Sequence, residues 1–275
     1  MELADSHIHL FRDGYTSRYG TAFARDDEVA LYEAFRSVHN IGPALVIGYE
    51  GDERFAGNNR YIAECSRQRP WVRPLQFRAI DNPPSLREEA DGAYLGIALY
   101  AMTEEDSLAL CRWPREAIEL LNARNSIVNL NARPEALAAI GPFAKRLGDC
   151  AILVSHLGLP GAYRMPPTAE AAFARLGPLR ELGKLSHVGV KISGLYAVSN
   201  PAHDYPHHSA YPFLNVLILE FGADRLYWGS DFSPALEHVS FAQTIDTIPR
   251  LGWSEDDMEA IMGGNLRRLL SQHAR

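Results

Sequence analysis

Two histidines separated by one residue, His7 and His9, end a short apolar segment near the start of the chain. In an extended strand, side chains at positions i and i+2 project from the same face, so both imidazoles would point to one place. Imidazole nitrogen is a common zinc ligand, and histidine is the side chain best suited to proton transfer near neutral pH. The pair alone is a weak signal, and its meaning depends on the residues that the rest of the chain brings beside it.

Two further polar residues end segments that are largely apolar. His156 closes the run that starts at Ala151, and Asp231 closes the run that starts at Arg225. Three imidazoles and one carboxylate can hold a divalent metal and leave a position for water. The carboxylate can also take a proton from that water and return it to a leaving group. Each residue alone is more often a capping or structural group, so it is the combination that favours a catalytic site.

The elements that must position these residues are short β-rich segments, which alternate with helical patterns along the chain. Several are almost continuously apolar, as in Ala44–Gly48, which is typical of strands covered on both faces of a parallel sheet. Eight such strands over this length predict a (β/α)8 TIM barrel, with an open doubly wound sheet as the alternative. We expect the strands at Glu2–His9, Ala44–Tyr49, Val72–Ile80, Tyr94–Tyr100, Ser126–Asn131, Ala151–His156, His187–Ser193 and Arg225–Asp231.

Helical spacing of apolar residues predicts helices between and after these strands. They are expected at Asp26–Asn40, Phe55–Gln68, Trp113–Asn125, Pro134–Leu147, Thr168–Leu182, Tyr211–Phe221, Ser254–Met262 and Asn265–His273. No repeat or linker is visible, so we expect residues 1–275 to form a single barrel domain. In such a barrel, the loops after the strands form the catalytic face, and the candidate residues end strands on that face.

Composition narrows the classes of protein that need to be considered. Apolar residues make up 47% of the 275 residues, and the formal net charge is −7, which argues against a general nucleic-acid or anionic-membrane surface. Three widely spaced cysteines are typical of reduced thiols. There is no secretory signal pattern and no apolar run of membrane-spanning length. We expect a cytoplasmic protein that binds a small-molecule substrate; homo-oligomer formation is left open.

Several motifs together resemble the amidohydrolase superfamily, and more narrowly its lactonase-like branch, which includes 2-pyrone-4,6-dicarboxylate lactonase and sugar-lactone hydrolases. The resemblance spans nearly the whole chain, and the order and spacing of the motifs are more specific than any one of them. The segments that carry it are Asp5-Ser6-His7-Ile8-His9, Val154-Ser155-His156-Leu157-Gly158-Leu159-Pro160, Lys191-Ile192-Ser193-Gly194-Leu195, Phe221-Gly222-Ala223-Asp224-Arg225-Leu226, Gly229-Ser230-Asp231-Phe232-Ser233-Pro234 and Gly263-Gly264-Asn265.

The resemblance implies a (β/α)8 hydrolase that opens a cyclic ester or cleaves a related bond. It implies that His7, His9 and Asp231 surround one divalent metal ion, with zinc the first expectation, and that Asp231 activates water. His156 would either join the ligands or polarise the substrate carbonyl. The fourth and fifth strands end at Tyr100 and Asn131, without the lysine and histidine of two-metal members. Some members of the branch use no metal, so a metal-free site is the alternative.

Four further residues are candidates for binding substrate. Arg78 could grip a carboxylate, and Lys191 could face the barrel mouth. Ser193 and Tyr196 could donate hydrogen bonds to the substrate. For Arg78 and Lys191 a structural role is an equal alternative, and for Ser193 and Tyr196 local capping and core packing are the more expected roles. His207 and His208 lie in a long loop and are expected at the surface.

Three functions remain open at this point. The first is a lactonase of the amidohydrolase type. The second uses the same site for non-oxidative decarboxylation of an aromatic or unsaturated acid. The third is a barrel that binds a ligand without catalysis. Nucleophilic-serine chemistry and nucleotide binding are not indicated, because the chain lacks G-x-S-x-G, G-x-x-x-x-G-K-[ST] and G-x-G-x-x-G.

Overall fold

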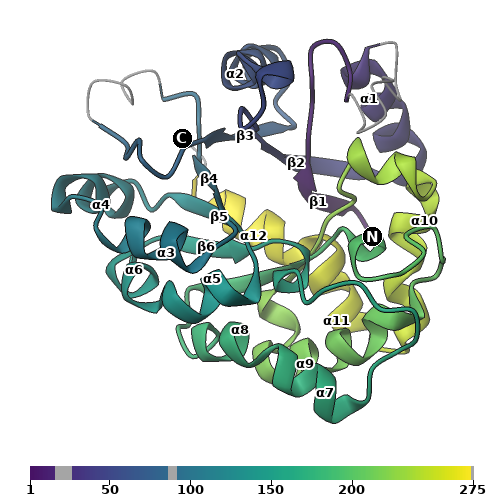
Figure 1. The fold of residues 1–275 in the computed structure, drawn as a ribbon. Coiled ribbons are helices and arrows are strands. Elements are labelled where there is room, and N and C mark those ends of the chain that lie inside the picture. Colours follow the sequence, from purple (N-terminus) through teal and green to yellow (C-terminus); the bar gives the residue numbers. More distant parts are fainter. Residues whose placement is uncertain (16–26, 86–91, 274–275) are drawn as a thin grey trace.

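The computed structural model describes residues 1–15, 27–85 and 92–273. Eight parallel strands lie side by side in chain order and nearly close a barrel, with helices around the outside (Figure 1). The predicted (β/α)8 barrel is therefore confirmed. The strands are β1 Leu3–Ile8, β2 Ile41–Ile47, β3 Val72–Phe77, β4 Gly96–Ala101, β5 Ile127–Ala132, β6 Ala151–Val154, β7 Val188–Ile192 and β8 Leu226–Trp228.

Helices connect the strands at most of the crossovers. Between β3 and β4, the described residues contain no helix. The α-helices are α1 Glu28–His39, α2 Asn58–Gln68, α3 Glu104–Cys111, α4 Arg115–Ala123, α5 Pro134–Ala139, α6 Gly141–Arg146, α7 Ala169–Arg175, α8 Gly177–Leu182, α9 Tyr211–Phe221, α10 Phe241–Asp246, α11 Glu255–Glu259 and α12 Asn265–Ser271.

Both faces of the sheet are buried, which explains the nearly continuous apolar runs. In β2, Ala44 and Val46 pack in the large cluster between strands and helices, whereas Leu45 and Ile47 belong to a second cluster. This second cluster extends to α12. Its strand members are Ala4, Leu45, Ile47, Leu75, Ala98, Ile127 and Leu153. The core therefore supports the strands from both sides and leaves their C-terminal ends free for polar residues.

The barrel is closed by side-chain and backbone bonds after β8 rather than by a full ladder between β1 and β8. The Asp5 carboxylate accepts hydrogen bonds from the backbone N–H groups of His7 (3.1 Å) and Ser230 (2.9 Å). It also accepts one from the Tyr32 hydroxyl at 3.0 Å. The Asp231 N–H donates to the His7 carbonyl at 2.8 Å. Asp5 thus ties β1, α1 and the segment after β8 together.

Replacing Asp5 with alanine should lower the free energy of unfolding by about 3 kcal/mol, because buried donors lose their acceptor. Tyr32→Phe removes one of these bonds and should cost about 1 kcal/mol. Both values can be measured by urea denaturation. Equal losses for the two variants would contradict the closing role assigned to Asp5.

Two predicted helices are each broken into two. Pro134–Leu147 divides into α5 and α6, and Thr168–Leu182 divides into α7 and α8. Each second helix starts with a Gly-Pro pair, Gly141-Pro142 and Gly177-Pro178. Proline lacks the N–H that a continuous helix needs and clashes with the preceding turn, so the chain restarts there.

Helices α3 and α10 were not predicted, since both are short and bury few residues. Both begin with a capping box. Thr103 and Asp106 form the one at α3, and Ser240 and Gln243 form the one at α10. These two capping boxes are the sequence signal from which α3 and α10 could have been predicted.

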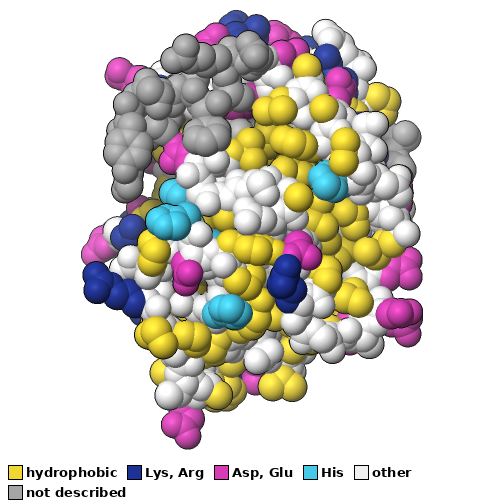
Figure 2. All heavy atoms as spheres, turned by 90° about the vertical axis from the view of Figure 1, so that its right-hand side faces the viewer, with side chains coloured by type: hydrophobic (Ala, Val, Ile, Leu, Met, Phe, Trp, Pro, Cys, Tyr) yellow, Lys and Arg dark blue, Asp and Glu magenta, His cyan; other side chains and the backbone are white. Residues whose placement is uncertain are grey.

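The surface carries mixed charge. On the face in Figure 2, acidic side chains are interspersed with basic ones, which lie in several separate places among the described residues. Within the described part of the chain, no helix combines the length and apolar character needed to cross a membrane.

Candidate active site

The four residues predicted from strand ends meet at one point. His7 lies in β1 and His9 one residue beyond it, whereas His156 and Asp231 follow β6 and β8. The Nε2 atoms of His7 and His9 lie 3.6 and 4.0 Å from Oδ1 of Asp231. Nδ1 of His156 lies 3.9 Å from Oδ2 of the same carboxylate. All four side chains are buried. Asp231 is thus the centre around which the imidazoles gather.

Three of these residues fit a divalent cation. One ligand atom from each of His7, His9 and Asp231 lies within 4.8 Å of the others. Nδ1 of His9 contacts the Ile47 carbonyl at 2.8 Å; since a carbonyl only accepts, the proton is on Nδ1 and Nε2 keeps its lone pair. Nε2 of His7 is buried without a hydrogen-bond partner among the described residues. A buried nitrogen of this kind, facing a carboxylate, suits a metal ion.

His156 stands beside this group rather than within it. Its ring centroid lies 4.6 Å from that of His7, and its Nδ1 lies 3.0 Å from the Ser193 hydroxyl. The His156 ring also lines the open cavity above the site. This position suits contact with a bound substrate.

Burial controls the charge state of the imidazoles. Loss of solvent lowers the pKa of His9 to about 4 and that of His156 to about 4, and it lowers the pKa of His7 well below its usual range. The Lys191 charge lowers the pKa of each further. The imidazoles are therefore neutral at pH 7, which is the form that binds metal or accepts a proton.

Burial acts in the opposite direction on the carboxylate. It raises the pKa of Asp231 to about 6, and His9 together with a 2.7 Å hydrogen bond from the Tyr196 hydroxyl limits the rise. Burial also lowers the pKa of Lys191 to about 7. A carboxylate with a raised pKa that stays ionised near neutral pH has the properties of a general base.

These pKa values predict how metal binding depends on pH. If His7, His9 and Asp231 hold a divalent cation such as zinc, its affinity should change little between pH 8 and 6.5, since these groups are largely unprotonated there. Below about pH 6, where Asp231 takes up a proton, affinity should fall about tenfold per pH unit and more steeply once the imidazoles titrate. Competition with a chelator, corrected for the chelator's own protonation, measures this. If the affinity instead fell about a hundredfold per pH unit from pH 7 downward, two protons would compete with the metal, and the imidazoles would have ordinary pKa values.

The backbone at the site requires a glycine at position 194, a role that was not predicted from the sequence. His156 and Asp231 both have left-handed backbone conformations, with φ of 52° and 58°. Gly194 also has a positive φ of 60°, and a Cβ there would lie 2.5 Å from Nδ1 of His156 and 3.2 Å from Oδ2 of Asp231. Only glycine lets this loop pass so close to both side chains. The Lys-Ile-Ser-Gly-Leu motif, which starts at the end of β7, contained this signal.

An open cavity of about 280 Å³ lies above the four residues. Half of its lining residues are phenylalanine or tyrosine. Arg54 at its edge is held by Asp52, with Nη2 and Oδ2 2.8 Å apart. Oδ1 of Asn131 is buried without a hydrogen-bond partner in the described part of the chain. The lining residues are His9, Phe11, Tyr15, Tyr49, Arg54, Phe55, Tyr100, Asn131, His156, Tyr196, Asp231 and Pro234.

The four predicted substrate-binding residues divide into two pairs. Tyr196 lines the cavity, and Ser193 contacts the His156 ring beneath it. Arg78 and Lys191 are buried, at 4% and 0% exposure, and are absent from the described lining of the cavity. Nζ of Lys191 instead donates to Oδ1 of Asn129 at 2.6 Å. The structure therefore brings Ser193 and Tyr196 to the site, whereas Arg78 and Lys191 are not among the described residues that line the cavity.

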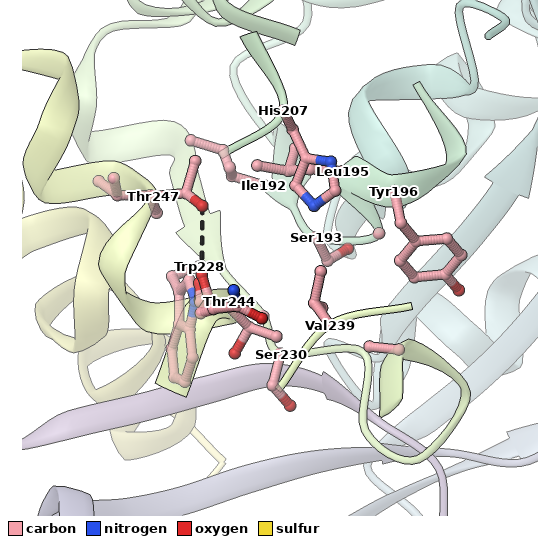
Figure 3. Close-up of a pocket in the computed structure, with 15 residues that line it drawn as sticks. Ile192, Ser193, Leu195, Tyr196, His207, Trp228, Ser230, Val239, Thr244 and Thr247 are labelled. Carbon is pink, nitrogen blue, oxygen red and sulfur yellow. Dashed lines mark hydrogen bonds between the residues drawn. The ribbon is translucent and has the colours of Figure 1, made fainter. Parts of the chain in front are cut away.

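A second cavity, of about 20 Å³, is lined by residues at and after the ends of β7 and β8 and has room for about one water molecule (Figure 3). His207 lines it and is 3% exposed, so the prediction of a surface position for His207 was wrong. Its Nδ1 contacts the Ser199 hydroxyl at 3.0 Å, and this partner removes the cost of burying a polar ring. His208 is exposed, as predicted.

Comparison with known proteins gives matches of two kinds. A sequence profile described as amidohydrolase matches residues 4–272. The chain is also similar to an L-fucono-1,5-lactonase from Burkholderia ambifaria, with 26% identity over 151 residues. That match covers 55% of this chain and 49% of the relative, so it spans about half the length of the curated protein.

Solved structures share the fold over the whole chain. An amidohydrolase from Burkholderia multivorans aligns with a TM-score of 0.84 at 17% identity, covering 98% of this chain and 99% of the other. A second crystal form of it, with bound zinc, aligns with a TM-score of 0.81 at the same identity and coverage. A putative 2-pyrone-4,6-dicarboxylic acid hydrolase from Pseudomonas putida aligns with a TM-score of 0.69 at 22% identity, covering 100% and 99%.

Proposed function

The chain belongs to the amidohydrolase family, and from this premise we propose that it is a hydrolase that opens a small cyclic ester, a lactone. The observation that carries the proposal is the Asp231 carboxylate, which faces three neutral imidazoles at the floor of an open cavity. The similarity to an L-fucono-1,5-lactonase supports the choice of a lactone.

In the proposed reaction, Asp231 takes a proton from a water molecule, and the oxygen of that water attacks the lactone carbonyl. The Tyr196 hydroxyl holds Oδ2 of Asp231, so Oδ1 faces the water side together with His7 and His9. As the tetrahedral adduct collapses, Asp231 returns the proton to the leaving ring oxygen. Atoms balance, because one water is consumed and one hydroxy acid is formed.

We propose that His7, His9 and Asp231 hold one divalent cation, for which zinc is the first candidate. When bound, it would supply positive charge that stabilises the developing negative charge on the carbonyl oxygen. His156, which stands outside the three-residue group and lines the cavity, would contact the same carbonyl. A polarised donor at this position stabilises the adduct as an oxyanion-hole group does.

The cavity lining supports a ring-shaped substrate. Tyr15, Tyr49, Phe55 and Tyr100 supply flat apolar faces with hydroxyl groups at three of their edges. Aromatic faces pack well against sugar or aryl rings, and hydroxyl groups form hydrogen bonds with ring substituents. The unpartnered Oδ1 of Asn131 can accept a bond from a substrate hydroxyl.

The test is a panel of five- and six-membered lactones with and without hydroxyl substituents, incubated with the purified protein. Acid release measured at constant pH reports ring opening, and headspace analysis reports carbon dioxide. The proposal expects acid release well above the spontaneous rate and no carbon dioxide. Carbon dioxide from an aromatic or unsaturated acid, with no lactone opened, would instead support decarboxylation. Binding without turnover of any compound would support a ligand-binding barrel.

A further inference from the structure

A buried row of polar side chains runs behind the site, from β7 through β5 and β6 to β1. Nζ of Lys191 lies 2.6 Å from Oδ1 of Asn129, and Oγ of Ser155 lies 2.9 Å from the same oxygen. Oγ of Ser155 also lies 3.4 Å from Nδ1 of His7. All four side chains are fully buried. None of the three residues behind His7 is used in the proposed reaction.

The chemistry of these groups fixes the direction of each hydrogen bond. Nζ of Lys191 donates to Asn129, and in its ammonium form it can only donate, so the Asn129 atom that faces it is the oxygen rather than the amide nitrogen. That oxygen also faces Ser155, so the serine hydroxyl must give its proton to Asn129. Ser155 is then left to accept from His7, which places the His7 proton on Nδ1.

We infer that Lys191, Asn129 and Ser155 are positioning residues that hold His7 in the tautomer whose Nε2 carries a lone pair toward Asp231. The unpartnered, buried Nε2 of His7 agrees with this direction, since it faces Oδ1 of Asp231 at 3.6 Å without a hydrogen-bond partner among the described residues. His9 reaches the same tautomer by a separate route, through the Ile47 carbonyl.

Lys191 thus fixes the orientation of the Asn129 amide without itself contacting substrate or metal. Without it, the Asn129 amide is free to turn, and its NH2 group would donate to Ser155. Ser155 would then donate to Nδ1 of His7, and the His7 proton would move to Nε2, where it blocks ligation. This part of the inference rests on the proposed metal site, but the tautomer itself does not.

The tautomer can be read directly in metal-free protein. Long-range proton–nitrogen correlation spectra of protein labelled with ¹⁵N-histidine distinguish Nδ1–H from Nε2–H, and a His7→Gln variant identifies the His7 signals. We expect Nδ1–H in the wild type, a shift toward Nε2–H in Lys191→Met, and loss of the preference in Ser155→Ala. Zinc affinity, measured by chelator competition, should fall roughly 10–100-fold in both variants, the usual effect of losing an outer partner of a ligand.

Two further variants separate this role from a general loss of structure. Asn129→Asp offers oxygens in both orientations and should keep the wild-type tautomer. If Lys191→Met fails to fold, Ser155→Ala decides the question. Ser107→Ala removes another fully buried serine hydroxyl, which donates to the Ala136 carbonyl at 2.8 Å, and should change neither readout. Folded Lys191→Met or Ser155→Ala that keeps the Nδ1–H tautomer would overturn the inference. So would Nε2–H in the wild type. None of these readouts depends on lactone turnover, so failure of the proposed function would be recognised separately.

Discussion

Replacing Asp231 with asparagine should reduce kcat/KM for lactone opening by roughly 10³-fold or more. The amide cannot take a proton from water, and loss of a general base alone commonly costs 10²–10⁴-fold. The same change removes a negatively charged partner of the proposed cation. The side-chain shape is kept, and the Tyr196 hydroxyl still finds an oxygen acceptor, so the variant should fold. Initial rates of acid release at constant pH, with saturating and limiting lactone, measure the effect.

The matched control is Asp149→Asn, which changes an exposed carboxylate just before β6, at the opposite end of the strands from the site. It should retain wild-type kcat/KM. If Asp231→Asn kept more than about a tenth of the wild-type rate, Asp231 would not be the base that activates water, and the reaction scheme proposed above would be wrong.

His9→Gln should produce the second large effect, a loss of zinc affinity of more than about 100-fold. This exceeds the roughly 10–100-fold cost of losing an outer partner, because a ligand itself is removed. Glutamine is polar and close in size to histidine, so the strand end should be preserved. Metal content after dialysis and chelator competition give the two measurements.

His203→Gln is the control, since His203 is exposed in the loop after β7. It should bind zinc as the wild type does. If His9→Gln bound one zinc ion per chain with wild-type affinity, His9 would not be a ligand, and the proposed set of metal ligands would be wrong.

The sequence allowed the strand ends of the site to be predicted because their logic is local. His7 and His9 share a face by strand geometry alone, and parallel strands with two buried faces have a recognisable apolar pattern. Their carboxyl ends meet at one end of a barrel, so His156 and Asp231 could be added from order alone. Ser193 follows β7 directly and Tyr196 lies in the next turn, so both could be named as candidates for the site, although a structural role for each was the more expected one.

The features of the site that were not predicted depend on which strands become neighbours and on the register between them. The partners of Lys191 are on β5, 62 residues away, and no spacing pattern indicates that its ammonium meets Asn129 rather than the barrel mouth. The need for glycine at Gly194 arises only from the His156 ring beside it. His207 is buried because it lines the small cavity together with Ile192 and Trp228 and its ring contacts Ser199, which the polar composition of its loop did not indicate.

Zinc titration of chelator-treated protein, followed by lactone opening, tests the central claim most directly. If His7, His9 and Asp231 hold one cation that the reaction needs, the treated protein is inactive and activity rises linearly to a break at one equivalent of zinc. Full activity after complete metal removal would contradict the metal-assisted site. A break at two equivalents would contradict the single-ion site built from these three residues.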